Sequence, residues 1–556
     1  MSGQSLQSYT TSTTLPPLLR DLLRKRGLAT PAAIETFLHP DYQTGLADPF
    51  LLSDMELAVK RILAAANKQE AVAVYGDYDA DGVAAATLMS ETLRFQGLNP
   101  ITYIPDRYQE GYGLHRAALG QLQKKGVTLV VAVDCGITNV NEVAWANQHG
   151  LDIIIVDHHE VPPELPQAVA VVNPQRFGDA YPCKDLAGVG VAFALTRALQ
   201  QRTGQPAVGR EKWLLDLVAL GTVCDVMPLV GENRVMASFG LRVLRKTKRV
   251  GLVALAQSAG IELEGLKAYH LGYVLGPRLN AAGRLQHANQ SLELITTSDP
   301  IRAQKLAFQL EELNHQRQLE QERIIQEANA AAANYRGDPV LVLADPNWPH
   351  GIVGIAASKL AENWHKPTLL LQILGDTAKG SGRSVAGYNL IDGLRSRADL
   401  FTRLGGHHFA AGFTLPTENL DQLRTVLAAH FRELAPTPAP NPQPEADIDI
   451  TNPADITWEL YELLSLLEPY GSANPEPVFG LSQLKVIEGG TVGKSQQHLR
   501  LKLAAATGQV YQAIGFNLAE KYPNLKPGQV IDLLCYIKKN DFNGRSTLQL
   551  VVVSIQ

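Results

Sequence analysis

The stretch Val74-Tyr75-Gly76-Asp77-Tyr78-Asp79-Ala80-Asp81-Gly82 places a carboxylate at every second position, directly after the apolar run 71–74. A short apolar run bounded by turn residues predicts a strand, so the acids are expected at its carboxyl end. Three acids within five residues repel one another, and a fold that draws them together needs a divalent cation between them. An acidic surface loop is the alternative for this stretch alone, and it is rejected only if further ligands follow in the chain.

Length and composition limit the class of protein. A chain of 556 residues is too long for one hydrophobic core and indicates roughly three or four domains. With 45% apolar and 19% charged residues it has the composition of an ordinary folded protein. The formal charge of -5 and the pI near 6.3 exclude a globally basic surface, so any contact with nucleic acid must come from local patches.

The cysteines and the N-terminus indicate the compartment. The four cysteines are widely separated and form no CxxC pair, which fits a reducing compartment better than disulfides or a zinc site. Residues 1–14 lack a secretory pattern, and no apolar run approaches the ~20 residues that span a bilayer. A cytoplasmic protein without a membrane segment is therefore expected.

Short apolar runs alternate with helical stretches from Gln69 onward, which predicts a mostly parallel sheet covered on both faces. The expected strands are 71–75, 101–104, 128–133, 153–156 and 169–172. Ligands of such sheets bind beyond the carboxyl ends of the strands. The first, third and fourth strands run into residues of metal-ligand type: Asp77 and Asp79, Asp134-Cys135-Gly136, and Asp157-His158-His159.

Helices are expected to dominate from there to about Arg336. The apolar segment 215–225 reads as a helix that carries Asp225 at its C-terminal end, where an acid opposes the helix dipole and is costly unless a cation receives it. Asp225 is therefore a candidate ligand, with an exposed loop acid as the alternative. In 276–284, Arg278 and Arg284 stand among small residues that allow close approach to an anion, although a buried structural arginine has the same pattern. Residues 301–335 predict one long amphipathic connecting helix.

A second α/β pattern begins at Pro339, with strands at 340–344 and 368–373 and a helix near 352–362. Two glycine-rich stretches within it, 379–384 and 404–408, combine glycines with Arg or His and are interpreted as loops that cradle an anion. Alternate prolines from Pro436 to Pro444 then favour an extended linker and mark a domain boundary.

The C-terminal part reads as a small β-barrel with strands at 485–487, 498–503, 511–516, 530–538 and 547–555. From Lys485 onward nine Lys and Arg face four Asp and Glu, a local charge of +5. Basic groups with interleaved aromatic rings suit single-stranded nucleic acid, although some of the rings must fill the barrel. These rings belong to Tyr511, Phe516, Tyr522, Tyr536 and Phe542.

The predicted fold class is α/β: two α/β domains, the first with a mostly parallel sheet, joined by a long helix and followed by an OB-like β-barrel. The expected boundaries are lead-in helices 1–68, a catalytic domain 69–300, a connecting helix 301–336, a second α/β domain 337–434, a proline-rich linker 435–446 and a nucleic-acid-binding barrel domain 447–556.

The motifs resemble those of the DHH phosphoesterase superfamily with its DHHA1 domain. The resemblance lies in 77–82, Asp134-Cys135-Gly136, Asp157-His158-His159 and Gly405-Gly406-His407. It continues through 276–284 to 471–477, which is similar to the glycine-rich NPEP turn before the OB fold in the single-strand-specific exonucleases of this superfamily. The resemblance covers nearly the whole chain from Ala71, with one departure at Ala473, where glycine is expected.

The resemblance implies two divalent ions, Mn²⁺ or Mg²⁺, with Asp134 between them. The implied ligands are Asp77, Asp79, Asp134, His158 and Asp225. Four carboxylates nearly neutralise two dications, and the imidazole favours Mn²⁺. Asp81 is expected to be a structural acid. The pyrophosphatase and nano-RNase branches carry a histidine where this chain has Ala73, so the chain departs from them.

The implied reaction is two-metal hydrolysis of single-stranded DNA in DNA repair and recombination, releasing mononucleotides in the 5′ to 3′ direction. Asp79, Asp134 and His159 are the implied catalytic residues, with His159 donating to the scissile phosphate or the leaving group. The implied substrate-binding residues, several around a terminal 5′ phosphate, are Arg107, Arg278, Asn280, Ser381, Arg383 and His407. A helicase and a single-strand-binding protein are partner candidates, and a monomer is expected.

Two other functions fit parts of this pattern. A phosphoesterase of short nucleotides or cyclic dinucleotides would use the same metals, but it would not need the barrel or the connecting helix. A non-catalytic scaffold that binds single strands in replication would keep the fold but lose ligands, whereas all five candidates are present here.

Overall fold

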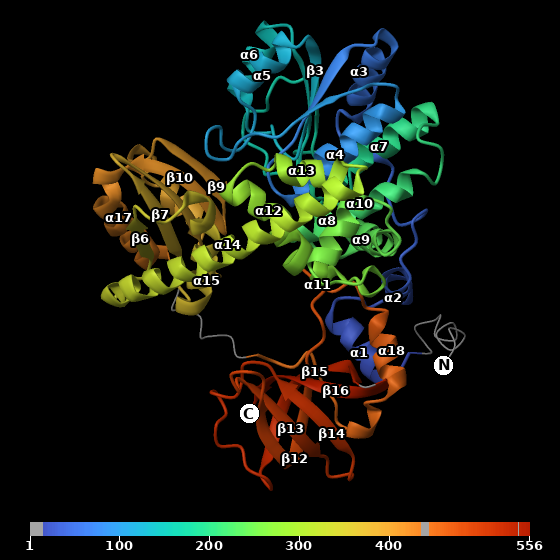
Figure 1. Cartoon of the computed structure of the whole chain (residues 1–556), viewed down its shortest axis with the longest axis vertical. Coiled ribbons are helices and arrows are strands. Elements are labelled where there is room, and N and C mark those ends of the chain that lie inside the picture. Colours follow the sequence, from blue (N-terminus) through green and yellow to red (C-terminus); the bar gives the residue numbers. More distant parts are fainter. Residues whose placement is uncertain (1–14, 435–443, 543) are drawn as a thin grey trace. The chain divides into compact units, whose positions relative to one another are not determined.

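The computed structural model describes residues 15–434, 444–542 and 544–556 (Figure 1). Contacts between residues divide the chain into two compact units. The larger unit contains residues 47–227 and 239–434, and the smaller contains 15–46, 228–238 and 444–556. The predicted N-terminal lead-in 1–68 is thus divided between the units, and most of the predicted proline linker lies outside the described residues.

The first sheet of the larger unit is wholly parallel, with strand order β2-β1-β3-β4-β5. Its strands are β1 (Ala71–Tyr75), β2 (Ile101–Tyr103), β3 (Val127–Val133), β4 (Asp152–Val156) and β5 (Ala170–Val172). Five helices cover it: α3 (Met55–Lys68), α4 (Ala80–Phe95), α5 (Arg116–Lys124), α6 (Val140–Gln148) and α7 (Gly188–Thr203). Helices α5 and α6 share one core with the sheet, while α4 and α7 contact β3 separately (Figure 1). Coverage on both faces explains why the strands are nearly continuous apolar runs.

Helices follow the first sheet, as expected from the sequence. They are α8 (Leu215–Cys224), α9 (Gly231–Leu244), α10 (Val250–Ser258), α11 (Ala268–His270), the π-helical turn η5 (Leu271–Leu275), α12 (Gly276–Leu285), α13 (Asn289–Thr296) and α14 (Pro300–Ala332). Helix α14 has 33 residues and is the predicted long helix. It begins with Pro300, whose missing N–H costs nothing there, and with Asp299, whose side chain accepts a hydrogen bond from the N–H of Ile301.

The second sheet of the larger unit has the order β6-β7-β8-β10-β9. Its strands are β6 (Leu341–Asp345), β7 (Thr368–Leu374), β8 (Thr377–Arg383), β9 (Arg403–His407) and β10 (Ala410–Pro416), with helices α15 (His350–Trp364), α16 (Leu390–Arg395) and α17 (Leu420–Leu434). The interpretation of the two glycine-rich stretches as loops is wrong, because they form most of β8 and β9. Gly380 is required by packing, since a Cβ at this position would lie 2.5 Å from the ring of Phe413.

The smaller unit contains a closed barrel. Its strands run in the order β12-β13-β14-β16-β15, and a further pairing of β12 with β15 closes the ring. They are β12 (Phe479–Val492), β13 (His498–Ala504), β14 (Val510–Gly515), β15 (Val530–Phe542) and β16 (Arg545–Ile555), with the short strand β11 (Ile448–Asp449) beside β12. The fold class predicted from the sequence is therefore confirmed.

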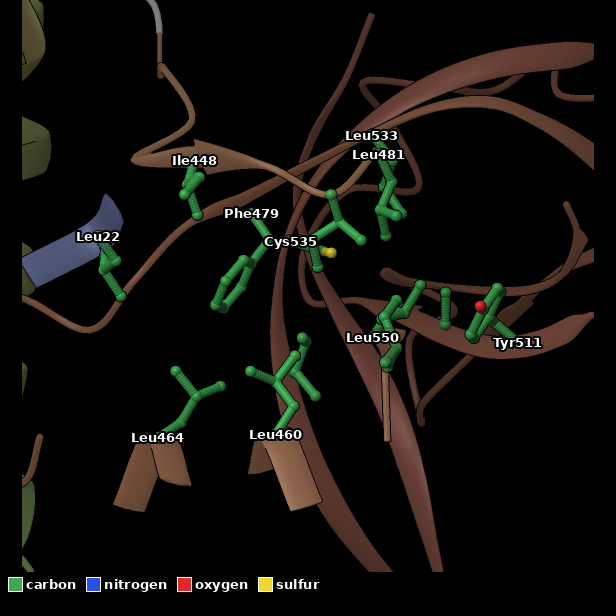
Figure 2. Packing of buried hydrophobic residues seen from close by; sticks show 14 of the residues in the cluster. Leu22, Ile448, Leu460, Leu464, Phe479, Leu481, Tyr511, Leu533, Cys535 and Leu550 are labelled. Carbon is green, nitrogen blue, oxygen red and sulfur yellow. The ribbon is translucent and has the colours of Figure 1, made fainter. Parts of the chain in front are cut away.

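Three helices complete the core of the smaller unit: α1 (Pro17–Lys25), α2 (Pro31–Leu38) and α18 (Trp458–Ser465). Figure 2 shows Leu22 of α1 and Leu460 of α18 in the same cluster as Phe479 of the barrel. Among the barrel aromatics, Tyr511 is buried in this core, whereas Phe516 is 53% exposed. The side chain of Phe542 lies outside the described residues.

Arg26, directly after α1, holds the turn at 471–477. Arg26 donates hydrogen bonds to Asn474 Oδ1 and to the carbonyl of Pro475, both at 2.6 Å. Ala473 in this turn has φ +57°, the left-handed conformation that glycine adopts more readily. The departure noted in the sequence therefore falls where a Cβ is costly. No helix in the described part of the chain is long and apolar enough to cross a membrane.

Candidate metal centre and substrate cleft

The acids after β1, β3 and β4 meet because parallel strands end at the same edge of a sheet. Asp77 follows β1, Asp134 follows β3, and His158 follows β4. Asp225 caps the C-terminal end of α8. The Nε2 atom of His158 lies 3.2 Å from Oδ1 of Asp134 and 3.5 Å from Oδ2 of Asp225. The structure thus brings together side chains from four separate segments.

The donor atoms of this cluster fit divalent cations. In Asp77-Asp79-Asp134 and in Asp134-His158-His159, the candidate ligand atoms lie within 4.8 Å of one another. Within the described residues, three buried carboxylate oxygens have no hydrogen-bond partner: Oδ1 of Asp77, Oδ1 of Asp134 and Oδ2 of Asp225. Nε2 of His158 is close to the last two but forms no hydrogen bond with either. A buried oxygen without a partner is costly unless a cation takes that place.

The electrostatics of the cluster lead to the same conclusion. Burial, and then repulsion from Asp79, raises the pKa of Asp77 to about 8. Burial and the neighbouring carboxylates also hold the pKa of Asp134 and Asp225 well above the usual range. Burial, followed by the proximity of His159, lowers the pKa of His158 to about 4, so its imidazole is neutral and able to bind a metal. A dication would stabilise the ionised carboxylates that otherwise repel one another.

Asp79 and Asp81 bond to backbone donors. Asp79 is the N-cap of α4, and its Oδ1 accepts from the N–H groups of Asp81 and Gly82, each at 3.0 Å. Asp81 accepts from the N–H groups of Gly188 and Val189 at the start of α7, at 2.7 and 3.1 Å. Asp81 also lies within 4.8 Å of His158 and Asp225, but both of its oxygens are occupied, which fits a structural acid.

Asp157 has a positioning role that the sequence did not indicate. It is fully buried, and its Oδ1 accepts from the N–H groups of His158 and His159 and contacts Nδ1 of the His159 ring at 2.7 Å. Burial alone would lower the pKa of His159, but Asp157 raises it to about 9. The hydroxyl of Tyr112 lies 3.0 Å from the same Nδ1 atom, and no motif marked this tyrosine.

A cleft of about 380 Å³ adjoins the cluster and is lined by residues of both α/β parts of the larger unit. Arg107 and Ser381 lie in its wall, and Arg383 donates to the hydroxyl of Ser381 at 2.9 Å. Burial, and then repulsion from Arg107 and other arginines, lowers the pKa of Arg284 to about 9. In the described part of the chain, no carboxylate lies within ion-pair distance of Arg107, Arg284, Arg317 or Arg383. Such a group of uncompensated guanidinium groups attracts a phosphate.

Family models match three parts of this chain. They are the DHH family N-terminal domain at residues 71–222, the DHHA1 domain at 337–433 and the RecJ OB domain at 447–554. The chain is 36% identical to the single-stranded-DNA-specific exonuclease RecJ of Bacillus subtilis (strain 168), over 98% of this chain and 69% of that protein. It is 34% identical to the RecJ of Dickeya dadantii (strain 3937), over 97% of this chain and 96% of that protein. The chain belongs to the RecJ family.

Solved RecJ structures agree with this assignment. A crystal structure of RecJ from Thermus thermophilus in complex with Mn²⁺ matches with a TM-score of 0.81 and 29% identity, covering 98% of this chain and 78% of that one. A crystal structure of exonuclease RecJ bound to manganese matches with a TM-score of 0.61 and 33% identity, covering 70% of this chain and 96% of that one. The superfamily predicted from the motifs is confirmed.

The remaining expected substrate residues of this RecJ-family chain differ in their surroundings. Asn280 accepts a hydrogen bond from the N–H of Ala80 at 2.7 Å, beside the metal cluster. Nε and Nη2 of Arg278 donate to the two carboxylate oxygens of Glu311 in α14, so this cation is already paired. His407 lies at the end of β9, where burial, and then Arg383, lowers its pKa. Of the two arginines noted in 276–284, Arg284 is the one without a carboxylate partner among the described residues.

Proposed function

We propose that this chain is a metal-dependent exonuclease that degrades single-stranded DNA from a 5′ end and releases 5′-mononucleotides. Membership of the RecJ family supports the activity and the substrate class. The observation that carries the proposal is a cluster of carboxylate oxygens without hydrogen-bond partners, beside arginines that have no carboxylate partner among the described residues. Negative and positive groups placed side by side suit a phosphodiester held between cations and guanidinium groups.

The proposed ligands of two Mn²⁺ or Mg²⁺ ions are Asp77, Asp79, Asp134, His158 and Asp225. When bound, such ions lower the pKa of a shared water and stabilise charge on the phosphoryl oxygens. Asp157 orients the ring of His159, whose raised pKa keeps it protonated near neutral pH. His159 is therefore the proposed donor of a proton or hydrogen bond to the scissile phosphate or leaving group.

Direction follows from the proposed site for the terminal 5′ phosphate. Arg107, Ser381 and Arg383 form it with Arg284, which replaces Arg278 in this role because Arg278 is paired with Glu311. A strand anchored there would present its first phosphodiester to the ions that Asp77, Asp134 and His158 would hold. Asn280 is proposed to hold the loop of Asp79, and His407 to support the second sheet beside Arg383.

Other expectations from the sequence stay predictions. They are a role in DNA repair and recombination, binding of a helicase and a single-strand-binding protein, a monomeric state and a cytoplasmic location.

The test uses purified full-length protein with Mn²⁺ and single strands labelled at either end. A 5′-labelled strand should release labelled mononucleotide in the first turnover, whereas a 3′-labelled strand should shorten progressively. Asp134→Ala should abolish both, and Asp376→Ala, an exposed acid in the β7–β8 turn, should leave both unchanged. Release of no mononucleotide by the wild type, or equal activity of Asp134→Ala, would refute the proposal.

A further inference from the structure

Two tyrosines form an exposed stacked pair on the larger unit. Tyr269 in α11 is 62% exposed, and Tyr273 in η5 is 74% exposed. Their ring centroids lie 5.1 Å apart, with an interplanar angle of 24°. Residues four positions apart on a helix often stabilise it by such contact, which is the competing explanation. Helix stabilisation, however, does not require aromatic faces that remain largely open to solvent.

The tyrosine pair belongs to a helical stretch that reaches the metal cluster. Elements α11, η5 and α12 follow one another without a break, and Asn280 in α12 bonds to the N–H of Ala80. At about 1.5 Å per helical residue, Tyr273 and Tyr269 lie about 10 Å and about 16 Å along the helix from Asn280.

The same stretch packs closely against the helix that ends at Asp225. The thiol of Cys224 donates to the carbonyl of Leu271 at 3.5 Å, and a Cβ on Gly276 would lie 2.4 Å from Cys224 Sγ. The rigid contact fixes the distance between the tyrosines and the acid at the end of α8. The π-helical form of η5 is also a feature that is frequent at functional sites.

A basic segment, 242–249, is joined to the tyrosine segment. Arg245 donates two hydrogen bonds to the carbonyl of Leu266, at 3.0 and 2.9 Å, two residues before the start of α11. Exposed on the basic segment are Arg242, Lys246 and Lys248, and none of the three lies within ion-pair distance of a described carboxylate. The turn between the segments carries two exposed acids, Glu262 and Glu264, so attraction to phosphate must come from the basic segment alone.

We propose that Tyr269 and Tyr273 stack on bases of the single strand beyond the cleaved bond, while Arg242, Lys246 and Lys248 contact its phosphates. This inference rests on the proposed function and adds a strand-binding surface to it, separate from the metals, the 5′-phosphate site and the barrel. Aromatic faces that stack on bases beside cations that follow the backbone are the two elements of single-strand recognition without sequence preference.

The experiment measures binding apart from cleavage. In an Asp134→Ala background, Tyr269→Ala and Tyr273→Ala should each weaken binding of a strand of roughly 16 nucleotides by about 5-fold to about 150-fold. Tyr269→Phe and Tyr273→Phe keep the ring and should stay within about 2-fold of the parent. Lys246→Ala should lower the slope of log Kd against log salt by about 0.7, whereas the tyrosine variants leave that slope unchanged. Ile301→Ala, 80% exposed at the start of α14, is the control.

Cleavage of a dinucleotide separates this surface from the catalytic centre. At about 3.4 Å per nucleotide, a dinucleotide is too short to reach the tyrosines, so Tyr269→Ala and Tyr273→Ala with Asp134 intact should cleave it at the wild-type rate. Unchanged binding of the longer strand would overturn the inference and leave the surface to a protein partner. An equal loss of long-strand binding and of dinucleotide cleavage would overturn the inference as well, because the variants would then have damaged the metal centre. If the wild type degrades no single strand but the tyrosine variants still bind it more weakly, the proposed function fails and the surface stands.

Discussion

Without its divalent ions, the larger unit should become less stable as the pH rises toward 8. In the ion-free protein, burial and repulsion from Asp79 raise the pKa of Asp77 to about 8, from 3.8 in an unfolded chain. Between these two values the folded protein keeps a proton that the unfolded chain has lost. Stability is therefore complete at low pH and is lost as the pH rises toward 8.

The magnitude follows from the number of protons retained. Each one changes the free energy of unfolding by about 1.4 kcal/mol per pH unit. His158 opposes this trend only near its unfolded pKa of 6.5, and its contribution falls toward zero as the pH rises above that value. Asp77 alone should contribute a loss of about 1.4 kcal/mol per unit between pH 6.5 and pH 8, which is a fall in Tm of about 2 °C per unit for a unit of this size. His159, whose pKa is raised to about 9, adds a loss in the same direction.

The assay is thermal unfolding of chelated and Mn²⁺-loaded protein across this pH window. Mn²⁺ replaces the retained proton, so the increase in Tm on adding the ion should grow with pH. The side chain in Asp77→Asn cannot ionise. This variant should therefore reduce the slope of the unfolding free energy of the ion-free protein against pH by the contribution of one proton, about 1.4 kcal/mol per unit. A Tm of the ion-free protein that rises with pH, or an effect of Mn²⁺ that is the same at every pH, would refute the reasoning.

Three substitutions test close packing and backbone strain. Gly188→Ala places a Cβ 2.4 Å from Oδ1 of Asp134, so cleavage of labelled single strands should fall by about 100-fold, with weaker Mn²⁺ binding in a titration. Arg234, 2% exposed, donates to the carbonyls of Phe37, Leu466 and Leu467, so Arg234→Ala should destabilise the smaller unit by about 3 kcal/mol in urea unfolding. Ala473→Gly relieves the left-handed φ and should stabilise that unit by about 0.5 kcal/mol, whereas a loss of stability would contradict this explanation.

The sequence predicted the sheets well because their burial leaves a simple pattern. Strand β1 matches the expected run 71–75, and its last four residues are buried. The glycine-rich strands β8 and β9 were misinterpreted because their glycines are selected by neighbouring strands and rings. The contact of Gly380 with the ring of Phe413 joins residues 33 positions apart, and no local pattern records such a contact.

The sequence predicted which types of residue form the candidate site, but not which other side chains each of them contacts. Arg278 and Arg284 both stand among small residues in the sequence, but in the fold Arg278 is paired with Glu311 of α14. Tyr112 stands in a loop without a motif and reaches His159 only in the folded chain. Contacts between distant segments decide these roles, so one sequence without the fold cannot assign them.

The acids of the site differ in what their oxygens contact, and this difference separates structural acids from the proposed metal ligands. Asp81 and Asp157 are buried, but their oxygens accept from backbone N–H groups of α7 and of the loop after β4. Asp77, Asp134 and Asp225 are acids of the same kind, yet each keeps a buried oxygen without a partner. The first group fixes the loops by satisfying the backbone, so the second can remain unsatisfied and close together. Their mutual repulsion is the cost of this arrangement, and a divalent cation is the ligand that removes it.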